Sequence, residues 1–179
     1  MENFKYLGVL LSEDNNNQTD LQERVQNANK TYFMLQKFFK NKSISKKLKS
    51  ILKNTTVDKT LTYLSETGTV TKRDRKQMNI FERKVYRRIL GPVHDNEQEN
   101  WRILTNKETY ARVKKPTIIE TIRLNGLRWF GHVQRMEGNR IPRKVLYMNL
   151  GTRRLRGRPR NRWQDEVREG VRKVGGEGW

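Results

Sequence analysis

Cysteine is absent from this chain, and histidine occurs only as His94 and His132. The first absence excludes disulfides, zinc knuckles and thiol nucleophiles, and the scarcity of histidine excludes histidine-rich metal sites. No apolar run approaches the roughly 18 residues of a membrane-spanning helix, and the N-terminus lacks the charged-then-apolar pattern of a signal peptide. We therefore expect an intracellular protein, neither secreted nor membrane-bound, in the nucleus or the cytoplasm.

Apolar and acidic residues are both scarce. Hydrophobic residues make up 34% of the 179 positions, below the roughly 45–50% of ordinary globular domains, so we expect a thin core. Only 19 Asp and Glu oppose 39 Lys and Arg, and the formal net charge is +20. So much charge of one sign opposes compaction and favours an anionic partner. Nucleic acid fits better than a membrane surface, because the arginines come with Gly, Pro and Asn rather than on a long amphipathic helix.

Hydrophobic periodicity predicts a mainly α fold with one short buried strand at 4–11. The first helix should begin near Thr19, with Gln22 as its capping-box partner. Its apolar stripe consists of Leu21, Val25, Ala28, Tyr32, Leu35 and Phe39. A second helix should turn Ile44, Leu48, Ile51 and Leu52 inward and Lys46, Lys47, Lys49 and Lys53 outward. The segment 57–63 favours neither helix nor strand.

Further helices follow in the second half of the chain. Thr71 and Asp74 should cap a helix that ends at Gly91-Pro92 and buries Met78, Phe81, Val85 and Ile89. A short helix should pass through Trp101 and Leu104. Pro116 should open a longer one that buries Ile118, Ile119, Ile122, Trp129 and Val133. From residue 139 the pattern becomes irregular, until a last short helix at 163–171.

The most basic part of the chain lies between Arg140 and Arg162, where no acidic residue occurs. Arginine on a Gly/Pro-rich backbone cannot build a core, but it can neutralise phosphates and release their counterions. We predict that nucleic acid is bound by Arg128, Arg135, Arg140, Arg143, Lys144, Arg153, Arg154, Arg156, Arg158, Arg160 and Arg162. An alternative is minor-groove binding, because residues 156–159 resemble an AT-hook. A solvated basic linker is a third interpretation.

Few other residues suggest chemistry. Trp129 and Phe130 lie among arginines and suit stacking on a single strand. Core packing is the favoured interpretation of Trp129, and Phe130 is left open. His132 is predicted to pack near a helix end rather than contact a base. The polar run at 94–99 contains His94, Asp95, Glu97 and Glu99 and is read as a solvated loop rather than a magnesium site. No nucleophile has a base partner nearby, and we expect neither catalytic residues nor a metal or cofactor.

Six blocks together resemble the C-terminal part of reverse transcriptases from non-LTR (LINE-type) retrotransposons. They are FKYLG at 4–8, YLSET at 63–67, FERK with RRILG at 81–91, RWFGHVQRM at 128–136, RIP at 140–142, and GRPR with Trp163 and Asp165. Their common order extends over nearly the whole chain. Two positions depart from the family pattern, because Leu64 replaces a glycine and Gly68 stands where an aromatic residue is usual.

The resemblance implies a division of the chain. Residues 1–15 would be an end-of-palm strand remnant, 16–92 a thumb-like helical bundle, and 93–179 a basic, partly irregular nucleic-acid-binding region. The family's polymerase carboxylates lie upstream of these blocks, and this sequence has no adjacent Asp-Asp pair. We therefore expect a non-enzymatic fragment that binds RNA, DNA or RNA–DNA hybrid. A chromatin-type AT-hook protein, a piece of a working polymerase and a remnant without function are the alternatives.

Overall fold

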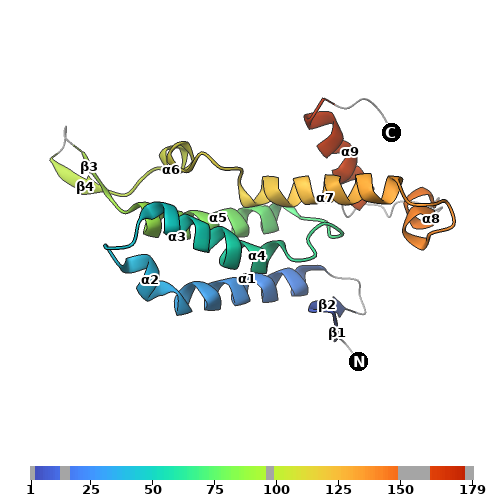
Figure 1. Cartoon of the computed structure of the whole chain (residues 1–179), viewed down its shortest axis with the longest axis horizontal. Coiled ribbons are helices and arrows are strands. Elements are labelled where there is room, and N and C mark those ends of the chain that lie inside the picture. The colour runs from blue at the N-terminus through green and yellow to red at the C-terminus, as the bar shows by residue number, and fades with distance from the viewer. Residues whose placement is uncertain (1–2, 13–16, 96–98, 149–161, 176–179) are drawn as a thin grey trace.

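The computed structural model describes residues 3–12, 17–95, 99–148 and 162–175, and it is mainly helical, as predicted (Figure 1). The helices are α1 (Asn17–Met34), α2 (Gln36–Lys40), α3 (Lys46–Leu52), the π-helix η1 (Lys53–Val57), α4 (Asp58–Thr62), α5 (Lys72–Leu90), α6 (Asn106–Val113), α7 (Ile118–Gln134), α8 (Ile141–Tyr147) and α9 (Trp163–Lys173). Two antiparallel hairpins pair β1 (Asn3–Tyr6) with β2 (Val9–Ser12) and β3 (Val93–Asp95) with β4 (Asn100–Arg102). Within the described ranges, no helix combines the length and apolarity that a membrane span requires.

The core lies where α1, α4, α5 and the first turns of α7 meet (Figure 1). The predicted stripe of the first helix is confirmed, although the chain breaks at Leu35 into α1 and α2. Ala28, Tyr32 and Phe39 are at most 3% exposed, and the other members of the stripe pack against them. The predicted cap at Thr19 is wrong, because α1 already begins at Asn17.

Helix α5 follows its sequence signals closely. Thr71 and Asp74 form the predicted capping box, and Gly91 ends the helix with a φ of 77°, a left-handed value that glycine adopts without strain. The predicted inward face is buried throughout, since Met78, Phe81, Val85 and Ile89 are at most 5% exposed. Local capping and a long apolar stripe therefore suffice to define this helix.

The inward face predicted for the second helix is only partly correct, because Leu52 packs against the core and Lys46 and Lys47 are exposed as predicted, but other positions are reversed. In α3, Leu48 and Ile51 are 50% and 45% exposed, whereas Lys49 is buried. Lys53, the first residue of η1, is completely buried. The ammonium group of Lys53 lies 2.7 Å from a carboxylate oxygen of Asp58 and 4.0 Å from the centre of the Tyr86 ring. An anionic partner and an aromatic ring offset the desolvation of this charge. The chain is helical through 57–63, which the sequence left open.

Glu82 connects this buried charge to the helix that carries the candidate site. Its carboxylate accepts a hydrogen bond from the backbone N–H of Ile118 at 3.0 Å, at the start of α7, and another from the hydroxyl of Tyr110 at 3.1 Å. Burial raises the pKa of Glu82, opposed chiefly by the charge of Lys53. Burial of Tyr110 itself, together with the nearby Glu82, raises the pKa of Tyr110 to about 12. One carboxylate therefore fixes the junction of α5, α6 and α7.

The hydrophobic periodicity of the sequence predicted neither of the two β-hairpins. Residues 4–11 form two strands instead of one buried strand, because Leu7 and Gly8 have φ values of 47° and 83° and reverse the chain in a tight turn. Phe4 and Tyr6 are each 57% exposed. The helix predicted through Trp101 is likewise wrong, since Trp101 lies in β4, and Leu104 is buried ahead of α6.

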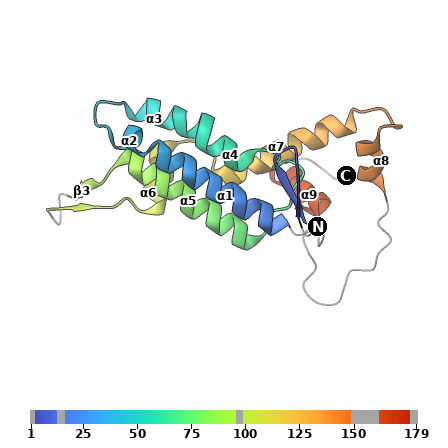
Figure 2. The ribbon, with the colours of Figure 1, turned by 90° about the horizontal axis from the view of Figure 1, so that it is seen from below.

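Beyond the core, α7 continues to one end of the molecule, where α8 follows it, whereas the β3–β4 hairpin lies at the opposite end (Figures 1 and 2). Helix α7 begins at Ile118, slightly later than the start predicted at Pro116. Its N-cap is Thr117, whose side chain accepts a hydrogen bond from the N–H of Glu120. Ile118, Ile122 and Val133 are buried as predicted, and Trp129 is half-buried. The prediction of irregular chain from residue 139 is wrong for α8.

Candidate nucleic-acid interface

Six of the predicted cations lie in the part of the chain that the structure describes. Arg128 lies on α7, Arg135 directly follows it, Arg140 precedes α8, Arg143 and Lys144 lie on α8, and Arg162 precedes α9. We call these six residues the basic face. The remaining predicted cations, Arg153, Arg154, Arg156, Arg158 and Arg160, lie outside the described residues, as does the segment that resembles an AT-hook.

A short corner between α7 and α8 brings the basic face together. The N–H of Met136 donates to the carbonyl of Val133 at 3.1 Å, and the N–H of Arg140 donates to the carbonyl of Glu137 at 3.1 Å. The guanidinium of Arg143 donates to the carbonyl of Met136, which ties α8 back to this corner. Arg143 is accordingly half-buried and serves the corner itself, while Arg140 remains exposed.

Three hollows in the surface group the cations. Arg135 and Arg140 line one hollow with His132 and Pro142. A second contains Arg128, His132 and Trp129, and a third contains Arg162 and Trp129. Arg128, His132 and Arg135 are spaced by four and three residues and so share one face of α7. The structure therefore groups cations from a stretch of sequence in which the first, Arg128, and the last, Arg162, are 34 positions apart.

The electrostatics of this end of the molecule are one-sided. Within the segment 123–162, the described residues include seven Lys and Arg and one acidic residue, Glu137. Among the described residues, Arg128, Arg135, Arg140 and Lys144 form no ion pair with a carboxylate. Arg128 donates instead to the neutral Asn125 at 3.3 Å. Their charges remain available to an external anion.

The structure also describes the aromatic residues near the end of α7. Trp129 is half-buried and lies with its ring centre 5.5 Å from that of His132, so it is neither fully in the core nor free on the surface. His132 is exposed, and the prediction that it packs at the helix end is wrong. Phe130 is half-buried.

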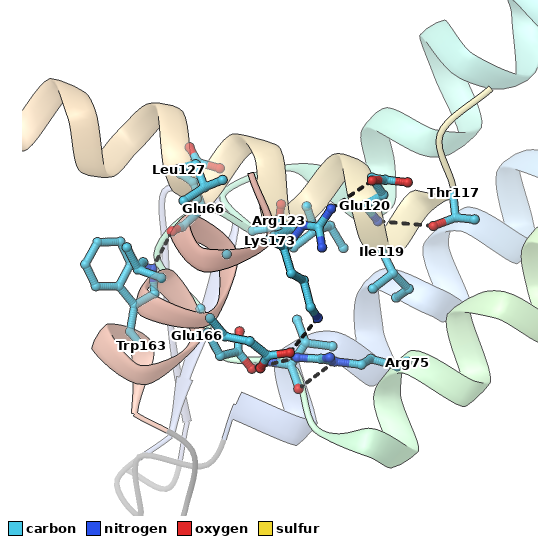
Figure 3. A pocket seen from close by; sticks show the side chains of 18 residues that line it. Glu66, Arg75, Thr117, Ile119, Glu120, Arg123, Leu127, Trp163, Glu166 and Lys173 are labelled. Carbon is cyan, nitrogen blue, oxygen red and sulfur yellow. Dashed lines mark hydrogen bonds and ion pairs between the residues drawn. The ribbon is translucent and has the colours of Figure 1, made fainter. Parts of the chain in front are cut away.

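Helix α9, which Arg162 directly precedes, packs against α7 (Figure 3). The indole N–H of Trp163 donates to the carbonyl of Glu66 at 2.7 Å. Glu166 accepts hydrogen bonds from the N–H of Val70 at 3.1 Å and from Arg75 at 3.3 Å. These contacts surround a cavity of about 240 Å3 between α9, α7 and the loop before α5. Sequence reasoning predicted α9 but could not predict its partners.

The ends of the arginine-rich segment are also close together in the described chain. The side-chain amide of Gln164, in α9, donates to the carbonyl of Leu146, in α8, at 2.9 Å. This bond joins the residues that precede and follow the segment 149–161. The C-terminal turn of α8 and the N-terminal turn of α9 therefore lie in contact.

The acidic patch at 94–99 has a structural role in its described part. Asp95 accepts a hydrogen bond from Arg102 at 2.9 Å, across the β3–β4 hairpin, while Glu97 lies outside the described residues. Arg102 also forms two hydrogen bonds with Glu108, and these hold the pKa of Glu108 well below its usual range. No three His, Asp or Glu side chains in the described chain are grouped as metal ligands.

Comparison of the chain with protein-family models, with curated proteins and with solved structures finds no match.

Proposed function

We propose that this chain binds nucleic acid through the basic face, without sequence preference, and that RNA, DNA and RNA–DNA hybrid are its partners. The observation that carries the proposal is that the four exposed cations of the basic face have no carboxylate partner within the described residues. They are Arg128, Arg135, Arg140 and Lys144. A phosphate backbone supplies the missing negative charge at regular intervals. Contacts to phosphate alone carry no sequence information, so binding of this kind tolerates any sequence.

We further propose that the chain is related to the C-terminal region of non-LTR retrotransposon reverse transcriptases, with the helices up to α5 in the place of the thumb. The backbone at Leu64 supports this relation. Its φ is 50°, a left-handed value that glycine adopts most easily, and glycine is the residue of the family pattern at this position. Because the sequence has no adjacent Asp-Asp pair, the proposed activity is binding rather than polymerisation. A primer-extension assay with the full chain should give no product.

A salt series tests the proposed binding. We expect log affinity for duplex DNA to fall linearly with log salt, with a slope of about −0.9 for each phosphate that is neutralised. A triple variant, R128A/R135A/R140A, should make the slope shallower by up to about 0.9 for each arginine that contacts a phosphate. The matched control is K40A/K42A/K46A, which removes the same charge from exposed residues of α2, α3 and the turn between them, at the other end of the molecule.

Two results would overturn the proposal. A slope near zero for the unaltered chain would mean that it binds no phosphates, which is also what a remnant without function predicts. Equal losses in the two triple variants would mean that overall charge, and not the basic face, drives binding. A strong preference for A·T-rich over G·C-rich duplex would favour the AT-hook alternative instead.

A further inference from the structure

A groove beside the basic face has walls that phosphate binding does not explain. It lies between α7, α8 and the start of α9 and has a volume of about 480 Å3, within the range of small-ligand sites. Ile141 and Val145, on α8, are 76% and 57% exposed along it. Trp129 and Trp163 line it from α7 and α9. A surface that bound phosphates alone would leave these apolar groups in water.

We infer that this groove accepts an unpaired base, so that the preferred ligand of the chain is a single-stranded nucleic acid; the inference rests on the proposed binding of nucleic acid by the basic face. A base has two apolar faces and is connected to a charged backbone. The groove matches both properties, because it presents flat aromatic and apolar walls with cations around its rim. A base paired within a duplex is stacked on both faces and cannot enter.

The aromatic walls are held in position before any ligand arrives. The indole N–H of Trp163 donates to the carbonyl of Glu66 at 2.7 Å, which fixes the ring between the groove and the cavity beneath α9. Trp129 belongs to the second turn from the end of α7 and lies against His132. Rings that are already ordered lose little conformational entropy when a base stacks on them.

Charge around the groove matches a polyanion rather than an apolar peptide. The ten residues that line the groove include Arg162 and no carboxylate. The two hollows that share Trp129 or Pro142 with it add Arg128, Arg135 and Arg140 against Glu66 and Glu137. Four arginines therefore oppose two glutamates among the residues that line these three hollows. A base in the groove would place its neighbouring phosphates over these arginines.

The test compares ligands that differ only in their bases. A labelled oligodeoxythymidylate of about 12 nucleotides, the abasic strand of equal length and a duplex are titrated with the full chain by fluorescence anisotropy. We expect the strand with bases to bind roughly tenfold tighter than the abasic strand. The variant I141E, which places a carboxylate on an exposed groove wall, should abolish this difference while binding of the abasic strand persists. The matched control I103E changes an isoleucine that is 71% exposed and lies outside the groove, and it should preserve the difference.

Each alternative outcome has a distinct meaning. Equal affinity for the abasic strand and the strand with bases, with salt-dependent binding of both, overturns the groove inference but leaves the proposed function intact. Equal effects of I141E and I103E also overturn it. Absence of binding to all three ligands at low salt overturns the proposed function and this inference together. If I141E instead converts a dimer to a monomer in sedimentation, the occupant of the groove is a second copy of the chain, and the inference is wrong.

Discussion

The ammonium group of Lys53 lies 3.9 Å from the carboxylate of Glu82, although the two side chains are only 0% and 1% exposed. Such a pair is costly to bury and is retained only when the remaining polar atoms find partners. Here Asp58 completes the partners of Lys53, and Tyr110 and the backbone of Ile118 complete those of Glu82. The core of this small protein therefore depends on an ionic cluster as well as on apolar packing.

Replacement of Lys53, which has carboxylate partners, should destabilise the fold far more than replacement of a buried lysine that has none. We expect K53M to lower the free energy of unfolding by about 3–5 kcal/mol, because Glu82 and Asp58 lose the cation that compensates them. The matched control is K49M, one turn earlier on α3. Lys49 is 6% exposed and has no ion pair within the described residues, so this variant should cost less than about 1.5 kcal/mol. Urea unfolding measures both, and equal losses would contradict the assigned role of Lys53.

The raised pKa of Glu82 predicts the direction of a pH effect. Burial makes the folded chain hold the Glu82 proton more tightly than the unfolded chain does. Stability should therefore fall as the pH rises from below the ordinary glutamate value through the raised value. In E82Q this contribution is absent, so the stability of the variant relative to the unaltered chain should increase with pH. Urea unfolding between about pH 4 and pH 8 measures the trend.

Glu108 provides a control of opposite sign. Its pKa lies well below the ordinary value because Arg102 and Thr105 donate hydrogen bonds to it. The stability that it contributes is present above the ordinary glutamate value and is lost as the pH falls. E108Q should therefore become less stable relative to the unaltered chain as the pH rises. Trends of the same sign in E82Q and E108Q would contradict the burial argument.

The packing of α9 on α7 predicts the effect of a larger side chain. A Cβ at Gly170 would lie 3.2 Å from the side chain of Leu127, whereas one at Gly138 would meet nothing within 4 Å. We expect G170L to separate α9 from α7 at a cost of about 1–3 kcal/mol and to speed cleavage by trypsin at Arg168. G138L should leave both properties unchanged. If the cleavage rates of the two variants agree, α9 is not held by this contact.

A strained helix end predicts a gain in stability. Lys114 follows α6 with a φ of 51°, in the left-handed region that disfavours side chains with a Cβ. K114G should raise the free energy of unfolding by about 1 kcal/mol. The neighbouring exposed Lys115 has no such backbone, and K115G should lower it by roughly 0.5 kcal/mol because glycine loses more conformational freedom. Thermal unfolding distinguishes the two, and a loss in K114G would contradict the prediction.

The sequence predicted what short-range patterns determine. Thr71 and Asp74 are three residues apart, and their capping box could be read directly. Lys53 could not be predicted as buried, because its partner Glu82 is 29 positions away. The burial of Lys49 next to exposed Leu48 also reverses the ordinary pattern. The turn at Leu7 was missed for a similar reason, since leucine rarely adopts a positive φ.

The candidate site shows the same division. Composition identified the cations, and each described one lies outside the core, but their grouping depends on the corner after Met136 and on the return of α9. The groove was missed altogether. Ile141 and Val145 lie in a stretch that was predicted irregular, and Trp163 reaches Glu66 from 97 positions away. Only tertiary contacts bring these walls together.

The hydrogen bond that the N–H of Ile118 donates to Glu82 fixes the start of α7. The helix has 17 residues, so it is about 26 Å long, with the buried carboxylate at one end and Arg135 at the other. A change of about 10° in the direction of the helix at Ile118 would move its far end by roughly 4.5 Å. A carboxylate deep in the core thus fixes the first residue of the helix whose far turns carry Arg128 and lead to Arg135.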